Sequence, residues 1–229
     1  MTASQNAGRD VILGRIREAL REPTPRPADP PPGALFPTLA PDELLGRFEK
    51  MLTLVSGVFY RATSWDDAQA WVREIANGLG ARVVASAPDE HVLRVVEPLA
   101  PRVVGGQDGG HGLRDVDLGV TGCDCLVAYT GSVVLTARSA AGRVLSILPP
   151  AHLVIARRDQ LVPHLADAYG LLRQRYGATV ESWPSMMTVI TGPSRTADIE
   201  KVLVLGAHGP KALFVLLLDL PDNAGAPIP

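Results

Sequence analysis

Hydroxyl, glycine and arginine residues gather between residues 191 and 200, where the chain reads Thr-Gly-Pro-Ser-Arg-Thr-Ala-Asp-Ile-Glu. The β-branched run before this segment predicts a strand, so the segment occupies the turn at that strand's end. Such a turn can direct backbone N–H groups, the hydroxyls of Ser194 and Thr196 and the guanidinium of Arg195 towards one anion. We therefore assign Gly192, Ser194, Arg195 and Thr196 to a site for a small carboxylate or phosphate, which we expect at the carboxyl edge of a parallel sheet.

A purely structural interpretation of the same segment carries equal weight. Ser194 or Thr196 could cap a short helix, while Arg195 forms a local ion pair with Asp198 or Glu200. Spacing alone leaves both interpretations open. Asp198 is therefore a supporting residue at most.

A second turn, Tyr129-Thr130-Gly131-Ser132, joins two predicted strands. The hydroxyls and N–H groups of Thr130, Gly131 and Ser132 could supply further donors to the same pocket, with Tyr129 as a supporting residue. A tight hairpin needs no ligand, however, and the sequence favours that interpretation.

Two histidines lie in turns close to predicted strands. His152 follows Pro149-Pro150 at the start of a strand, and His208 lies in the Ala-His-Gly-Pro-Lys turn before the last strand. Single histidines at such places are more often structural than catalytic, so both are supporting candidates only. The chain has no HExxH or other close metal-ligand spacing, and we expect no metal site.

The elements that must position these residues alternate between strands and helices. Apolar periodicity predicts core-facing helices over residues 42–55, 65–79 and 159–176, with Ser64 and Asp159 as N-caps of the second and third. β-branched runs predict strands over residues 58–60, 82–85, 116–120, 124–129, 132–137, 144–148, 152–156, 187–191 and 214–219. The alternation indicates an α/β fold, with a mainly parallel sheet flanked by helices.

The N-terminal region differs in composition from this α/β domain. Ile12, Ile16 and Leu20 recur at helical spacing, which predicts an amphipathic helix over residues 9–20 within an N-terminal segment 1–22. Frequent prolines predict an extended linker over 23–41, before a domain over 42–220 and a tail over 221–229. We expect the helix to dock on the domain or on another chain, which leaves a homo-oligomer open.

Composition excludes several classes of function. The formal net charge of the 229 residues is −2, so the chain lacks the general positive charge that favours nucleic acid. Its longest apolar run, residues 212–218, is far shorter than the roughly 20 residues of a membrane span. Charged residues interrupt the N-terminal apolar residues, so we expect no signal peptide and a cytoplasmic location. Cys123 and Cys125 are too few for an iron–sulfur cluster of their own.

Five segments, in this order, together resemble the LUD-domain family, and in particular its lactate-utilization proteins. They are residues 119–122, 128–132, 148–152, 190–200 and 206–210, which include Ala-Tyr-Thr-Gly-Ser, Leu-Pro-Pro-Ala-His and Gly-Pro-Ser-Arg-Thr-Ala-Asp-Ile-Glu. The resemblance covers about residues 42–220. It implies a fold similar to the NagB/RpiA/CoA-transferase group.

The resemblance also implies a role in oxidising L-lactate to pyruvate, together with iron–sulfur partner proteins. This chain would bind a small anion or those partners and would carry no redox cofactor. Members of the family commonly have an acidic residue where this chain has Tyr129, so catalysis that relies on that carboxylate would be lost. The alternative is an independent enzyme that acts on a small carboxylate, CoA ester or sugar phosphate.

Overall fold

The computed structural model describes residues 3–21, 37–104, 113–177, 179–196 and 204–220. The chain forms two compact units, Met1–Thr38 and Leu39–Pro229. In the first unit, helix α1 (Ala3–Ala19) begins nearer the N-terminus than the expected helix, and the side chains of Ile12 and Ile16 are exposed. Most of the proline-rich segment and the whole C-terminal tail lie outside the described residues.

The second unit is built on a six-stranded sheet in which every neighbouring pair is parallel. Its strand order is β1-β12-β7-β4-β2-β3. The strands are β1 (Val58–Ala62), β2 (Val84–Ser86), β3 (Arg102–Val103), β4 (Leu118–Thr121), β7 (Ala151–Arg157) and β12 (Ala212–Leu218). The expected fold class, a mainly parallel sheet flanked by helices, is confirmed.

A second sheet of four strands was not expected. Its order is β8-β5-β6-β9, formed by β5 (Cys125–Val127), β6 (Ser132–Thr136), β8 (Leu161–Val162) and β9 (Met187–Ile190). The pairs β5–β6 and β6–β9 are antiparallel, which confirms the hairpin at Thr130-Gly131. A separate two-stranded ribbon pairs β10 (Arg195–Thr196) with β11 (Val204–Leu205).

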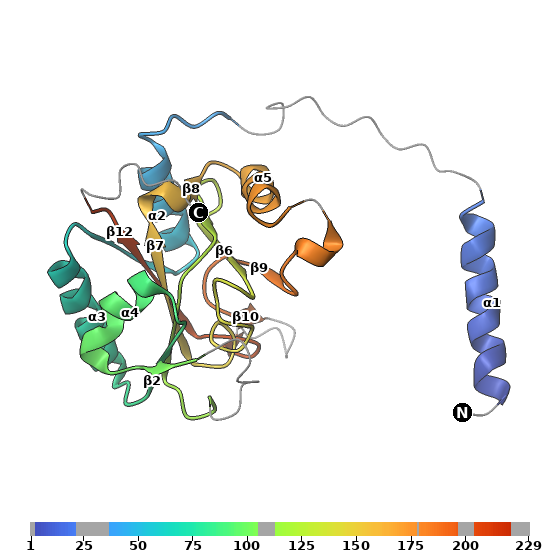
Figure 1. The fold of residues 1–229 in the computed structure, drawn as a ribbon, viewed down its shortest axis with the longest axis horizontal. Coiled ribbons are helices and arrows are strands. Elements are labelled where there is room, and N and C mark those ends of the chain that lie inside the picture. Colours follow the sequence, from blue (N-terminus) through green and yellow to red (C-terminus); the bar gives the residue numbers. More distant parts are fainter. Residues whose placement is uncertain (1–2, 22–36, 105–112, 178, 197–203, 221–229) are drawn as a thin grey trace. The chain divides into compact units, whose positions relative to one another are not determined.

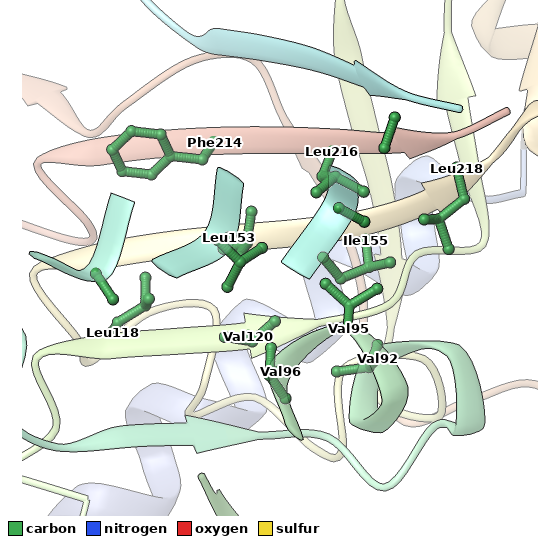
Figure 2. Packing of buried hydrophobic residues seen from close by; sticks show 14 of the residues in the cluster. Val92, Val95, Val96, Leu118, Val120, Leu153, Ile155, Phe214, Leu216 and Leu218 are labelled. Atoms are coloured by element: carbon green, nitrogen blue, oxygen red, sulfur yellow. The ribbon is translucent and has the colours of Figure 1, made fainter. Parts of the chain in front are cut away.

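One face of the parallel sheet packs against α3 (Trp65–Leu79) and α4 (Glu90–Val96). Alternate residues of β4, β7 and β12 point towards these helices, and Leu153, Ile155 and Leu216 belong to one apolar cluster with Val92 and Val95 (Figure 2). The opposite face packs against α2 (Leu44–Leu54) and the second sheet. Figure 1 shows α3 and α4 on one side of β7 and β12, with β6 and β9 on the other.

Local chemistry explains where the helices begin. Ser64 caps α3 as expected, because its Oγ accepts a hydrogen bond from the Asp67 N–H at 3.1 Å. The expected start of the later helix at Asp159 is wrong, since α5 spans Leu165–Tyr176. Residues 158–162 instead form a short 3₁₀ turn, η2 (Arg158–Gln160), and strand β8. Pro163 favours extended backbone at the residue before it, which explains the later start.

The expected strand over residues 144–148 is also wrong, because this segment is a turn. The N–H groups of Ile147 and Leu148 both donate to the Val144 carbonyl, at 3.1 and 2.9 Å. The Ser146 hydroxyl donates to the Arg143 carbonyl at 3.3 Å. These local hydrogen bonds replace the ladder that a strand would need.

Candidate functional site

A cavity of about 240 Å³ opens at the amino-terminal ends of β7 and β12. Its walls come from residues 146–147 of the turn before β7, from residues 188–194 at the end of β9 and from residues 208–210 before β12. His152 and Leu213, each the second residue of its strand, complete the lining. The cavity therefore lies at the opposite end of the parallel sheet from the edge where we expected a site.

His152 is the most unusual side chain of the lining because it is a fully buried titratable group. Its Nε2 lies 2.9 Å from the Thr121 hydroxyl, and its Nδ1 has no hydrogen-bond partner among the described residues. Burial lowers the pKa of His152 to about 3. The ring is therefore neutral near pH 7 and can act only as a neutral donor and acceptor.

The position of the turn beside His152 depends on a glycine in the neighbouring strand. Gly119 of β4 is the register partner of His152 on one side, and Leu213 of β12 is its partner on the other. A Cβ at Gly119 would collide with the Leu145 carbonyl oxygen and lie 2.9 Å from Pro149 Cγ. The missing side chain thus lets the turn rest on the sheet and bring Ser146 and Ile147 to the cavity.

Three hydroxyl groups connect the hairpin turn to the cavity. Ser132 Oγ lies 2.7 Å from Thr130 Oγ1 and 2.8 Å from Thr191 Oγ1. Thr191 lines the cavity, whereas Thr130, Gly131 and Ser132 do not. The two turns that we assigned to one pocket are therefore joined by hydrogen bonds, but the 129–132 turn supports the wall rather than forming it.

Both Thr-Gly turns also pack on the carboxyl end of α2. Gly131 and Gly192 have positive φ angles of +66° and +82°, which favour glycine. A Cβ at Gly131 would overlap the backbone of Met51 and Leu52, and one at Gly192 would overlap the Val55 carbonyl oxygen. Backbone packing alone therefore accounts for both glycines.

The structure separates Arg195 from the cavity lining. Its guanidinium donates to the Val55 carbonyl at 3.1 Å, at the end of α2, and its side chain is exposed. A cation there is favoured by the partial negative charge at a helix carboxyl end. Thr196 lies in β10, opposite Val204, and Asp198 lies outside the described residues.

Ser194 and His208, by contrast, meet at the cavity wall. The Ser194 N–H donates to the Pro210 carbonyl at 2.9 Å, and its carbonyl accepts from the Gly206 N–H at 2.9 Å. The His208 N–H lies 3.4 Å from Ser194 Oγ. These bonds hold the two lining segments together, with His208 exposed.

Tyr129 lies in a separate environment. Its N–H donates to the Pro163 carbonyl at 3.0 Å, and its ring centroid lies 5.2 Å from the His164 ring. The Arg47 guanidinium carbon lies 5.0 Å from the centroid of the same ring. Tyr129 thus packs between α2 and the start of α5, outside the cavity lining.

Comparison with known proteins shows which family model and which relatives this chain resembles. Residues 110–218 match the model of the LUD domain. This segment of the chain is similar to the LUD-domain family. Lactate utilization protein C of Geobacillus kaustophilus is 29% identical over 244 residues, which cover 96% of this chain and all of that protein. The protein of the same name from Anoxybacillus flavithermus is 27% identical, over 90% of this chain and 94% of its own length.

A shorter match and a solved structure are also similar to this chain. Lactate utilization protein C of Bacillus velezensis is 42% identical over 109 residues, which cover 46% of this chain and 44% of that protein. The crystal structure of a DUF162 family protein from Deinococcus radiodurans is similar in fold, with a TM-score of 0.54 and 22% identity. That similarity covers 79% of this chain and 99% of the Deinococcus chain.

The segment that matches the family model contains His152, both Thr-Gly turns and the His208 turn. Sequence reasoning had not singled out Thr121, Thr188 or Leu213, which lie in strands and look like ordinary sheet residues. A usable signal was the pair Gly119 and Pro149-Pro150, because a glycine in a strand indicates close approach of another segment.

A second buried polar cluster lies outside the cavity lining. The Asp124 carboxylate accepts hydrogen bonds from Ser139 Oγ at 2.7 Å, from the Tyr176 hydroxyl at 2.6 Å and from Arg175 at 3.1 Å. Burial and the hydrogen bond to Asp124 raise the pKa of Tyr176. Both carboxylate oxygens are bonded, so the cluster attaches α5 to the second sheet and leaves Asp124 little capacity for a ligand.

In the described ranges of the chain, no group of three or more His, Cys, Asp or Glu side chains is arranged to hold a metal ion. Cys123 and Cys125 are free and buried, and burial raises the pKa of both thiols, that of Cys125 to about 12. No helix in the described part of the chain combines the length and apolar character needed to cross a membrane.

Proposed function

We propose that this protein is a subunit of a system that oxidises L-lactate to pyruvate and works with iron–sulfur partner proteins. The observation that carries the proposal is the extent of similarity to proteins named lactate utilization protein C. The match with the Geobacillus protein covers 96% of this chain and the full length of that relative. Similarity over that length includes the N-terminal unit as well as the LUD domain.

In this proposal the cavity beside His152 binds a small carboxylate. Its volume of about 240 Å³ is below the range of about 300–1,000 Å³ typical of pockets for drug-sized ligands, which favours a molecule of few atoms. Four hydroxyl side chains contribute to the lining: Ser146, Thr188, Thr191 and Ser194. None of the described lining residues is Asp or Glu, so no acidic side chain of the wall repels an anion.

The oxidation would be shared between proteins. Converting L-lactate to pyruvate removes two electrons and two protons, and the clusters of the partner proteins would accept the electrons. This chain would bind the acid or bring the partners together, since its own buried cysteines are protonated near pH 7. This division of roles separates the proposal from an independent enzyme with a CoA-transferase-like fold.

Growth of a strain lacking the chain tests the proposed role. We expect slow or absent growth on L-lactate, normal growth on pyruvate, and recovery on L-lactate when the full-length chain is restored. Equal loss of growth on both carbon sources would contradict a specific role in lactate oxidation. Turnover of L-lactate by the purified chain without partner proteins would favour the independent enzyme instead.

A further inference from the structure

The cavity differs sharply between its buried and exposed sides. His152 is fully buried, whereas His208 is exposed to solvent on the same lining. Apolar side chains of Ile147, Ile190 and Leu213 also contribute to the wall. An asymmetric ligand would therefore meet different chemistry at its two ends.

The hydrogen bonds of His152 determine which ring nitrogen carries the proton. The Thr121 hydroxyl has one partner among the described residues, His152 Nε2 at 2.9 Å. If Nε2 accepts from that hydroxyl, the Thr121 proton is used and the neutral ring carries its own proton on Nδ1. In the other tautomer the Thr121 proton has no acceptor in the same described residues. The first arrangement is favoured, and it leaves a buried Nδ1–H donor without a partner.

A buried donor of this kind suits an uncharged oxygen better than a carboxylate. Because the His152 ring is neutral, it cannot balance a negative charge that is removed from water. No Lys or Arg is found among the described lining residues. The charged end of an acid would therefore be placed at the exposed side, where water and the His208 ring are available.

We propose that His152 Nδ1–H donates a hydrogen bond to the C2 oxygen of a 2-hydroxy or 2-oxo acid, whose carboxylate lies towards His208. The proposal rests on the function proposed above and names the ligand-binding residue and the bound orientation. The hydroxyl oxygen of lactate and the oxo oxygen of pyruvate can both accept this bond. Propionate has the same carbon chain and carboxylate but lacks an oxygen at C2.

Calorimetric titration of the purified full-length chain with L-lactate, pyruvate and propionate tests the proposal. We expect the wild type to bind both L-lactate and pyruvate about tenfold or more tightly than propionate. His152→Leu should bind all three acids with the low affinity that the wild type has for propionate. His152→Asn, which restores an N–H donor near the Nδ1 position, should recover part of the preference.

Two further variants distinguish this role from a general effect on the fold. His208→Gln should weaken the binding of all three acids by a similar factor, because it acts on the carboxylate. Gln160→Leu serves as a matched control, because Gln160 is also buried and polar but lies outside the cavity lining. Gln160→Leu should lower the melting temperature but leave the preference for acids with a C2 oxygen unchanged.

A measurement on the wild type keeps the proposal testable if His152→Leu does not fold. In nuclear magnetic resonance spectra of ¹⁵N-histidine-labelled protein, His152 should be protonated at Nδ1. That nitrogen signal should shift on saturation with L-lactate and stay unchanged with propionate. Protonation at Nε2 would overturn the proposal.

The remaining outcomes separate this inference from the proposed function. Equal affinity for propionate and L-lactate, or a preference unchanged in His152→Leu, would overturn the role of His152. Absence of binding by all three acids to the wild type would overturn it as well. None of these three results alters the growth test, which can still show a role in lactate oxidation when the cavity serves another purpose.

Discussion

The two faces of the parallel sheet are covered in different ways. Helices α3 and α4 cover one face, where side chains such as Leu153 and Leu216 form a continuous apolar layer (Figure 2). The other face is covered by α2 and the second sheet, and it contains the buried polar pair His152 and Thr121. The cavity opens on this second side.

Under the proposed function, the two faces of one sheet divide stability and binding between them. Helices pack on a sheet through regular apolar contacts that leave little space. The second sheet also packs on the first through apolar side chains, among them Val133 and Val154. On this side, however, hydroxyl groups and glycines lie in the turns next to the apolar cluster. We infer that the helix-covered face mainly stabilises the fold, whereas the sheet-covered face carries the chemistry.

The largest expected effect comes from truncating the apolar layer. Leu216 is fully buried against α3 and α4, so Leu216→Ala should lower the free energy of unfolding by about 2–5 kcal/mol. Urea denaturation measures this loss. The preference for acids with a C2 oxygen should survive in the folded fraction. A change in that preference would mean that the two faces do not act separately.

A smaller effect is expected where the turn rests on Gly119. Gly119→Ala should cost about 1–3 kcal/mol of stability, because the added Cβ forces the 145–149 turn away from β4. The same change should alter ligand affinity by displacing Ser146 and Ile147.

Gly46→Ala is the matched control for this substitution. No atom lies within 4 Å of a Cβ at Gly46 in α2, so the change should stabilise the protein by about 0.5–1 kcal/mol. Calorimetric melting compares the two variants. Equal effects would show that the turn does not depend on Gly119.

Lower pH should weaken the sheet-covered face through His152. The pKa of His152 is about 3 in the folded chain, against an ordinary value of 6.5. The unfolded chain therefore binds the proton first, and the contribution of neutral His152 to stability is lost as pH falls from 6.5 towards 3. The slope reaches at most about 1.4 kcal/mol per pH unit.

Urea denaturation between pH 6.5 and 5 measures this slope. Most carboxylates titrate below this interval, so they contribute little to the change in stability. The wild type should lose stability more steeply than His152→Leu over this interval. Parallel curves for the two proteins would show that His152 is not held neutral by burial.

The smallest effect is expected at Arg195. Arg195→Ala removes one exposed hydrogen bond to the Val55 carbonyl, so stability should fall by less than about 1 kcal/mol. Affinity for L-lactate should be unchanged, because Arg195 does not line the cavity. A tenfold loss of affinity in calorimetric titration would support the site that we predicted around Arg195 from the sequence.

The fold class and the hairpin at Thr130-Gly131 could be predicted because they depend on local patterns. Alternating strands and helices indicate a parallel sheet, and a glycine between two β-branched runs indicates a tight turn. The second sheet could not be predicted in this way, since the pairs β5–β8 and β6–β9 join short strands that are distant in sequence. The periodicity of a strand does not specify the sheet to which it belongs.

The positions of the candidate site residues relative to one another could be predicted only in part, for the same reason. Residues in turns, such as Ser194 and His208, attract notice from their types, and the structure brings them together. The role of Arg195 depends on the end of α2, which lies 140 residues away in sequence. The environment of His152 depends on Thr121 and on the close approach of the 145–149 turn to Gly119. Neither contact can be predicted from the residues that flank His152 in sequence.

The packing of two glycine turns on α2 has a consequence for genetic suppression. A side chain at Gly131 would meet the backbone of Met51 and Leu52, and one at Gly192 would meet the Val55 carbonyl. Because these overlaps involve backbone atoms, a smaller side chain at position 51, 52 or 55 would not relieve them. Compensating mutations for a defect at either glycine should therefore arise where they let α2 shift as a whole, and one such mutation should rescue defects in both turns.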